Sequence, residues 1–186
     1  MDITRILEDD HRSVEHLFEQ IDAAAGNARQ RLIDELALSL KGHMELEEET
    51  LYPAMAPITG NESVEEGNNE HQLARDALED MLQLAPDEPG FGAGFEAVKA
   101  AIAHHVREEE GEVFPKLRKQ GKRVLEEVAT PFMTKRLELG LPMEPPALAA
   151  AFTKDELVDE ADRAGIDGAS SMKKGELAEA LAGVMR

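Results

Sequence analysis

Six side chains that can bind a metal ion stand at positions where helical spacing predicts buried apolar residues. His11, for example, lies four residues after Leu7 and three before Val14, so it shares their face of a helix. The same reasoning selects every member of the set, which is His11, His43, Glu47, His71, His105 and Glu109. Because the chain has no cysteine, imidazole and carboxylate are its candidate metal ligands. The set predicts a metal site inside a helical protein.

This arrangement of histidine and glutamate occurs twice. Residues 43–53 (HMELEEETLYP) match residues 105–115 (HVREEEGEVFP) without a gap, at an offset of 62 residues. Asp10-His11-Arg12 likewise matches Glu70-His71-Gln72, at an offset of 60 residues. The repeat indicates one helical hairpin used twice, with each copy supplying a histidine and then an H-x-x-x-E motif.

Two ionised glutamates in an apolar core carry a large desolvation penalty, which metal cations can compensate. Imidazole with carboxylate suits iron, manganese or zinc. Four imidazoles, two bridging carboxylates and a bridging oxo or hydroxo group would leave two octahedral ions with about two free positions. The competing interpretation is structural: in a chain with 39 acids a single H-x-x-x-E is common, and a buried histidine can simply be hydrogen-bonded. The repetition in register favours the metal site.

Helical spacing also separates these residues from their neighbours. His104 is two residues from Ile102, and His16 is five residues from His11, so both histidines are expected to point away from the core. The remaining acids of the two motifs are expected on a solvated face: Glu45, Glu48, Glu49, Glu108, Glu110 and Glu112.

Four long apolar stripes with short connections predict an all-α fold, an up-down-up-down four-helix bundle, with a fifth helix near residues 124–137. A proline-rich segment from Gly140 then begins a linker. We predict a bundle domain over residues 1–140, a linker over 141–152 and a small helical module over 153–186. In that module a capping box at Thr153 opens one helix, residues 165–171 form a turn, and a second helix covers 176–185.

Composition limits the partners. The 186 residues carry 39 acids and 20 bases, a formal charge of −19, so nucleic acid and anionic membrane surfaces are unfavourable partners. The sequence has no apolar stretch long enough to span a membrane and no signal-peptide pattern at its start, so we expect a cytoplasmic location.

The doubled pattern of H followed by H-x-x-x-E, each glutamate followed by Leu-Tyr-Pro or Val-Phe-Pro, resembles the hemerythrin HHE cation-binding family over residues 1–140. The resemblance implies two iron ions with a bridging oxo or hydroxo group, held by the six residues above with Glu47 and Glu109 as bridges. It also implies small ligands, namely dioxygen, hydrogen peroxide or nitric oxide, and allows a catalase-like activity.

One departure from that family concerns the third helix. Invertebrate hemerythrins carry H-x-x-x-H there, but His71 is followed four residues later by Arg75. The resemblance therefore leaves a seventh ligand open. Glu15, four residues after His11 on the same helix face, is the first candidate, and Tyr52 and water are the others. Ferritin-like di-iron proteins use Glu-x-x-His, and zinc hydrolases use H-E-x-x-H; neither pattern fits here.

The C-terminal segment from Thr153 resembles the small helix-extended-helix modules of the SAP and Rho N-terminal type, many of which bind nucleic acid. Its five bases and eight acids give a net charge of −3, which favours protein docking over nucleic-acid binding. An alternative function for the whole chain is therefore an iron or oxygen sensor or adaptor that signals through residues 153–186.

Overall fold

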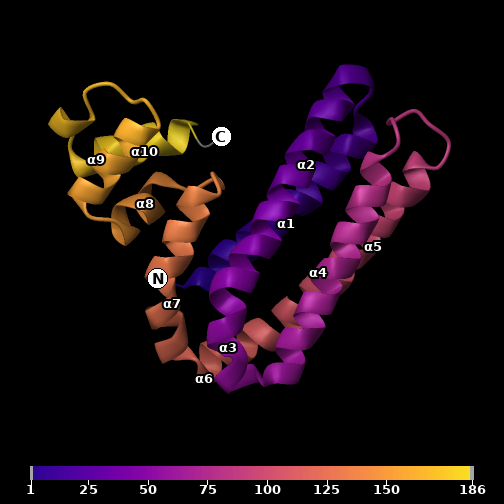
Figure 1. The fold of residues 1–186 in the computed structure, drawn as a ribbon, viewed down its shortest axis with the longest axis horizontal. Helices are drawn as coiled ribbons and strands as arrows, with labels where there is room; N and C mark the ends of the chain where they lie inside the picture. The colour runs from indigo at the N-terminus through magenta and orange to yellow at the C-terminus, as the bar shows by residue number, and fades with distance from the viewer. Residues whose placement is uncertain (1, 185–186) are drawn as a thin grey trace. The chain divides into compact units, whose positions relative to one another are not determined.

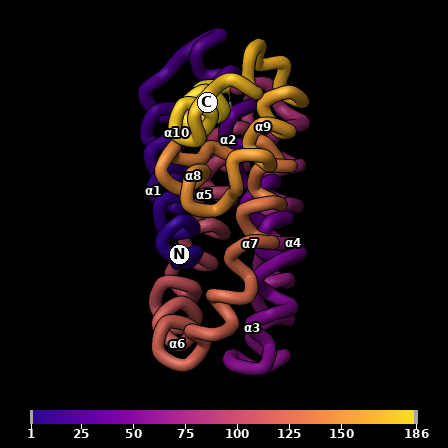
Figure 2. Tube along the Cα trace, turned by 90° about the vertical axis from the view of Figure 1, so that its left-hand side faces the viewer, coloured from indigo at the N-terminus to yellow at the C-terminus, as the bar shows by residue number. Residues whose placement is uncertain are grey.

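The computed structural model describes residues 2–184, and every regular element among them is helical. Four long helices form the predicted bundle, with α1 beside α2 and α4 beside α5 (Figures 1 and 2). They are α1 (Ile3–Ala23), α2 (Gly26–Leu46), α4 (Asn61–Leu82) and α5 (Phe91–Glu108). Over residues 2–184 no helix has the length and apolar character that a membrane span requires.

Local sequence signals account for where these helices begin. The carboxylate of Asp2 caps α1 by accepting a hydrogen bond from the backbone N–H of Thr4. Gly90 precedes α5 with φ of 103°, a conformation that favours glycine. Gly60, with φ of 100°, is the single residue between α3 and α4.

Two of the long helices continue through a π-helical turn. η1 (Glu47–Leu51) joins α2 to α3 (Tyr52–Thr59), and η2 (Glu109–Val113) joins α5 to α6 (Phe114–Gln120). In each turn a backbone N–H reaches the carbonyl five residues back, from Tyr52 to Glu47 and from Phe114 to Glu109.

The cause of both π turns lies one residue further on, where Pro53 and Pro115 have no N–H to donate. A widened turn with i to i−5 hydrogen bonds allows the helix to continue past a residue that cannot donate. The helical path therefore does not stop at Pro53 but continues to Thr59. Each π turn begins at one of the two motif glutamates.

Buried apolar residues of all four helices form the core of the bundle, including Phe18 of α1, Leu36 of α2, Leu78 of α4 and Phe95 of α5. The motif residues form a layer at one end of this core. Beyond that layer further apolar side chains are buried, among them Leu7, Leu51, Phe114 and Leu117. The layer is therefore enclosed by apolar residues on both sides, which limits its contact with water.

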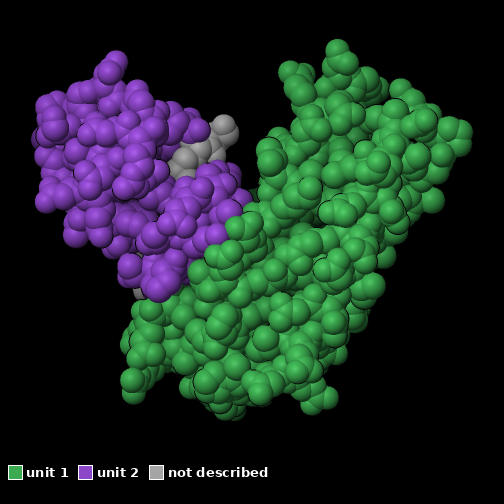
Figure 3. Space-filling view, in the orientation of Figure 1, with its two compact units in different colours: residues 1–128 green, residues 129–186 purple. Residues whose placement is uncertain are grey.

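The chain divides into two compact units, residues 1–128 and 129–186 (Figure 3). The predicted fifth helix is α7 (Lys122–Glu138), which runs through the point of division. The second unit then contains α8 (Pro145–Ala151), α9 (Lys154–Arg163), η3 (Ala169–Ser171) and α10 (Lys174–Val184). Leu148, Leu157, Leu177 and Leu181 are buried there, and α10 packs against both α8 and α9.

The second unit contains the predicted capping box, with Thr153 and Glu156 bonded reciprocally at the start of α9. Its last helix begins at Lys174, and its predicted end at Met185 lies outside the described residues. Residues 145–151 of the predicted linker are helical. The three-part division into 1–140, 141–152 and 153–186 stays a prediction.

Candidate metal centre

The four predicted histidines meet as two pairs in the interior of the bundle. Nε2 of His11 lies 3.3 Å from Nε2 of His43, and Nε2 of His71 lies 3.2 Å from Nε2 of His105. All four rings are buried. The first pair comes from α1 and α2, and the second from α4 and α5, so each half of the sequence repeat contributes one pair.

Each motif glutamate lies close to a histidine of the first pair and to a histidine of the second. Oε2 of Glu47 lies 3.3 Å from Nε2 of His43 and 3.3 Å from Nε2 of His71. Oε2 of Glu109 lies 3.4 Å from Nε2 of His11 and of His105. The two carboxylates therefore span the space between the histidine pairs.

The outer nitrogen of every ring has a carboxylate partner. Nδ1 of His11 donates to Glu110 at 2.9 Å, and Nδ1 of His71 donates to Glu48 at 2.9 Å. The other two bonds join His105 Nδ1 to Glu70 at 3.0 Å and His43 Nδ1 to Asp10 at 3.5 Å. Carboxylates only accept hydrogen bonds, so the proton of each neutral ring sits on Nδ1 and the Nε2 lone pair faces inward.

Two arginines lie behind these outer carboxylates. Arg12 contacts Glu110, and Arg75 Nη2 donates to Glu48 at 2.7 Å. Although partial burial would raise the pKa of Glu48, Arg75 and His71 hold it below its usual value. Arg75, which stands where the resemblance leads one to expect a fifth histidine, thus supports a histidine through a carboxylate.

The chemistry of this donor set fits cations. Four inward Nε2 lone pairs and two carboxylates converge, and both carboxylates lack a hydrogen-bond partner among the described residues. Glu47 is fully buried and Glu109 is 3% exposed. The donor atoms form two groups, and within each group all of them lie within 4.8 Å of one another. One group is His11, His43, His105 and Glu109, and the other is Glu47, His71 and His105. Without a cation, extra protons must compensate the negative charge of these groups.

The histidine pKa values reflect that need for positive charge. Burial by itself would lower the pKa of His43, but the carboxylates of Glu47, Asp10 and Glu109 raise it above its usual value. Burial opposes protonation of His105 as well, yet Glu109 and Glu47 raise its pKa well above the usual value. In the metal-free chain the neighbouring carboxylates therefore favour the protonated form of these two rings.

A pH dependence of the metal-free protein follows. The raised pKa values of His43 and His105 add stability that is complete below their unfolded value of about 6.5 and is lost as pH rises through the folded values. Burial would raise the pKa of Glu47, but the charge of His43 and the other nearby histidines hold it well below its usual range. The stability that ionised Glu47 adds to the folded metal-free protein is therefore present above about pH 4.3 and is lost at lower pH.

We expect the melting temperature of the metal-free protein to fall between pH 6 and pH 9, with a smaller slope in the His43→Gln/His105→Gln variant. Metal affinity should rise over the same interval, because protons compete with metal ions for Nε2. Differential scanning calorimetry and metal titration measure the two trends. A melting temperature that increases from pH 6 to pH 9 would contradict this account of the buried layer.

Tyr52 also reaches the layer. Its hydroxyl donates to Nε2 of His71 at 3.1 Å, and the two rings stack with centroids 5.2 Å apart. Burial, together with the carboxylates of Glu47 and Glu109, raises the pKa of Tyr52 well above its usual value, so the metal-free chain keeps a neutral phenol. A Cβ atom on Gly67 would lie 2.7 Å from this hydroxyl, so the glycine leaves room for the tyrosine.

Glu15, another candidate for a seventh ligand, lies away from the layer. Its side chain is 51% exposed and accepts hydrogen bonds from Arg12 at 2.7 and 2.8 Å. The reason is helical geometry. His11 lies near one edge of the buried arc of α1, whose other members include Val14 and Phe18. A further step of four residues turns the side chain about 40° more, out of that arc.

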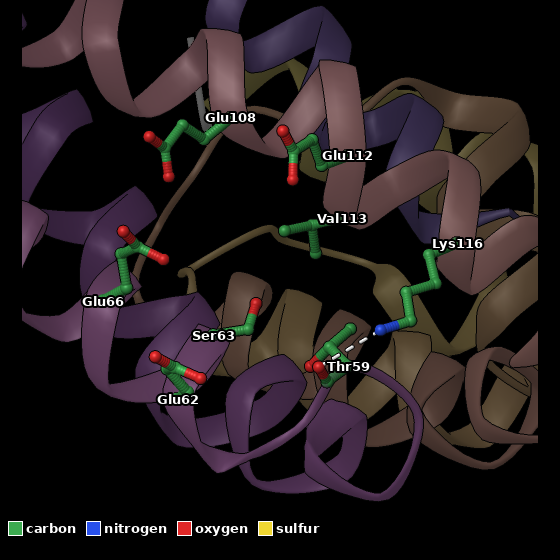
Figure 4. A pocket seen from close by; sticks show the side chains of 8 residues that line it. All are labelled: Thr59, Glu62, Ser63, Glu66, Glu108, Glu112, Val113 and Lys116. Carbon is green, nitrogen blue, oxygen red and sulfur yellow. Dashed lines mark hydrogen bonds between the residues drawn. The ribbon is translucent and has the colours of Figure 1, made fainter.

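A surface cavity adjoins the centre. It has a volume of about 210 Å³ and lies between the start of α4 and the η2–α6 segment, and Figure 4 shows its side chains. A second space of about 20 Å³, large enough for about one water molecule, is lined by Tyr52, His105 and Glu109 among others. The two spaces share four lining residues, Ser63, Glu66, Glu108 and Val113. They are therefore neighbours, one at the surface and one at the centre.

Comparisons with known proteins bear on the fold and the family of the chain. A solved structure of similar fold is that of a hemerythrin HHE cation binding domain-containing protein from Mycobacterium kansasii, a homologue of Rv2633c. Its TM-score is 0.60 at 20% sequence identity, over 97% of this chain and 99% of that chain. At this identity the likeness shows the fold.

Two relatives are similar in sequence over the bundle. A protein named DNA nickase from Nostoc sp. is 27% identical over 119 residues, which is 63% of this chain and 34% of that protein. Rv2633c of Mycobacterium tuberculosis is 26% identical over 116 residues, 59% of this chain and 68% of that protein. The chain thus spans about a third of the first relative's length.

The family comparison matches the part of the chain that carries both histidine pairs. The hemerythrin HHE cation binding domain matches residues 2–117, which contain all six motif residues and both π turns. The chain belongs to the hemerythrin HHE cation-binding family.

Proposed function

We propose that this protein holds two iron ions and binds or turns over small oxygen-type ligands. The proposed ligands are His11 and His43 for one ion and His71 and His105 for the other, with Glu47 and Glu109 bridging the two. The single observation that supports this assignment most strongly is that each glutamate oxygen lies 3.3 or 3.4 Å from one histidine of both pairs.

Imidazole and carboxylate donors suit iron, and the family resemblance implies that an oxo or hydroxo group would join the two ions. When bound, an iron pair supplies redox chemistry toward dioxygen, hydrogen peroxide and nitric oxide. Tyr52 is the better placed of the two protein candidates for a seventh ligand, because its hydroxyl lies 3.1 Å from His71 Nε2 whereas Glu15 is at the surface. Water at that position remains the third candidate.

The chain's own residues would prepare the site in two ways. The outer carboxylates fix each ring with Nε2 inward, so the metal-binding atoms are oriented before the metal arrives. The apolar layers on both sides limit access of bulk water, and the space beside Tyr52 and Glu109 is small, about 20 Å³. This size limit favours dioxygen, peroxide and nitric oxide over larger substrates.

Metal analysis together with an absorption spectrum of the purified protein tests the proposal. We expect two irons per chain and oxo-to-iron absorption bands, both absent after chelation. A chain that takes up no iron, or that binds one ion without those bands, would contradict it. Substituting Tyr52→Phe should change the spectrum if the phenol is a ligand and leave it unchanged if water takes that position.

Oxygen evolution separates the enzymatic version from the binding version. A catalase-like protein converts two hydrogen peroxide molecules into two water molecules and one dioxygen, and it should do so faster than the same concentration of free ferric ion. Evolution no faster than that of free iron rejects the enzyme and leaves reversible ligand binding, which spectral titration with nitric oxide or dioxygen would measure.

The second candidate is a sensor or adaptor in which the state of the iron alters docking through residues 153–186. The division of the chain into two compact units favours it. Metal removal should then change hydrogen-exchange protection within residues 153–184, and unchanged protection would reject this function. The nickase relative offers no support for nucleic-acid binding, because the match covers 34% of that protein and this chain's charge is −19.

A further inference from the structure

Carboxylates line a path from the protein surface to the candidate metal centre. Glu62 and Glu66 stand one helical turn apart on α4, and Glu108 and Glu112 face them across the cavity (Figure 4). The single basic side chain among the lining residues described, Lys116, is directed to the carbonyl of Thr59, to which it donates at 3.2 Å. The cavity therefore presents a strong excess of negative charge to solvent.

The same series continues inward with increasing burial. One turn beyond Glu66 on α4 lies Glu70, which is only 8% exposed. One of its oxygens accepts from His105 Nδ1 at 3.0 Å, and the other lies 3.0 Å from Nε2 of His104. Glu108 lies 3.4 Å from the same His104 nitrogen. These three residues offer ligand atoms within 4.8 Å of one another, in a group distinct from the two groups of the centre.

The path ends at a buried side chain without a hydrogen-bond partner. Glu109 is 3% exposed, both of its oxygens lack a partner among the described residues, and it lines the inner space together with Glu108 and Glu70. A buried carboxylate in this condition indicates a cation as the occupant. It distinguishes this path from an ordinary acidic surface.

We propose that this cavity is the route by which ferrous ions reach the centre, with His104, Glu70 and Glu108 as a transit site between the rim and the histidine layer. The inference rests on the proposed iron-binding function. A concave surface of one charge sign raises the local concentration of the opposite ion and can accelerate its association by about 10- to 1,000-fold. His104 adds an imidazole, which ferrous ion prefers over carboxylates alone.

Anaerobic loading of the metal-free full chain tests the route. Ferrous ion is mixed with protein at low ionic strength, and the iron that remains free is measured over time with a colorimetric chelator. For the rim variant Glu62→Gln/Glu66→Gln/Glu112→Gln we expect loading at least about 10-fold slower, with the same final iron content. Salt near 1 M, where the screening length is about 3 Å, should remove most of the difference.

A matched control removes three exposed acids elsewhere on the bundle, in the variant Asp34→Asn/Glu35→Gln/Glu79→Gln. It has the same net charge as the rim variant, so equal loading rates in the two variants would overturn the inference. The transit site has its own test, since His104→Ala should slow loading at saturating ferrous ion without changing the final spectrum, and an unchanged rate would remove His104 from the route. If the wild-type chain fails to load two irons, the proposed function fails instead.

Discussion

Replacing Glu47 or Glu109 with alanine is expected to remove both irons. Each carboxylate spans the two histidine pairs, so either substitution takes a ligand from both ions at once. Loss of a residue that merely supports a ligand costs about 10- to 100-fold in metal affinity, and loss of a shared ligand should exceed the upper figure. A 100-fold loss corresponds to about 3 kcal/mol, which would lower the melting temperature of the iron-loaded protein by roughly 6–12 °C.

The matched control is Glu35→Ala, an exposed acid on the same helix as His43, which should retain two irons and the wild-type melting temperature. Iron analysis and calorimetry before and after chelation measure the effect. In a purely structural core, by contrast, the double variant Glu47→Ala/Glu109→Ala would lose two unfavourable buried charges and melt at a higher temperature. That gain in stability, measured against the wild-type protein with iron supplied to both, would contradict the metal assignment.

Glu48→Ala and Glu110→Ala should each weaken binding of one iron by about 10- to 100-fold. Glu48 holds His71 and Glu110 holds His11, in both cases through the ring Nδ1. Without the carboxylate the ring loses its preferred tautomer and orientation, and the basicity of Nε2 falls. Because the two acids support different histidine pairs, each substitution should affect a different ion.

Competition with a chelator gives the two iron dissociation constants separately for each variant. Arg75→Met provides a graded comparison, because Arg75 contacts Glu48 and not the histidine itself. This substitution should reduce iron affinity less than Glu48→Ala does, and Glu35→Ala should leave the affinity unchanged. Glu48→Gln keeps a hydrogen-bond acceptor without the charge, so its iron affinity should lie between those of the wild type and Glu48→Ala. Equal affinities across this series would show that the outer carboxylates do not tune the metal.

Much of the bundle and of its inner layer can be predicted from spacing. Residues three and four apart on a helix share a face. A histidine or glutamate at a position where this spacing predicts an apolar residue is therefore a candidate buried ligand. The repeat then predicts that both hairpins aim their groups at one layer. All six motif residues are buried, and the structure brings them together.

The outer carboxylates were missed by the same spacing rule. Glu48 and Glu110 directly follow the motif glutamates, so on an ideal helix they are turned about 100° from them, and the sequence interpretation placed them on a solvated face. The structure shows them bonded to His71 and His11. The available signal was the repeat itself, since both acids occupy the same position in residues 43–53 and 105–115.

The π turns were missed for a different reason. Helical periodicity assumes a constant number of residues per turn, whereas a proline without an N–H makes a local widening favourable. Pro53 and Pro115 each stand six residues after a motif glutamate, so the widened turn starts at a candidate ligand in both hairpins. The repeated spacing from glutamate to proline is the sequence signal for this feature.

The exchange of outer carboxylates between hairpins bears on how such a centre could have arisen. Glu48 of the first hairpin holds His71 of the second, and Glu110 of the second holds His11 of the first. One hairpin alone has two inward histidines, but one of them lacks its supporting carboxylate. Two identical hairpins related by a two-fold axis would supply the complete set to each other. A half-length ancestor of this bundle would therefore have needed to form a homodimer before it could hold a metal pair, and fusion of two such copies would have preserved that mutual dependence within one chain.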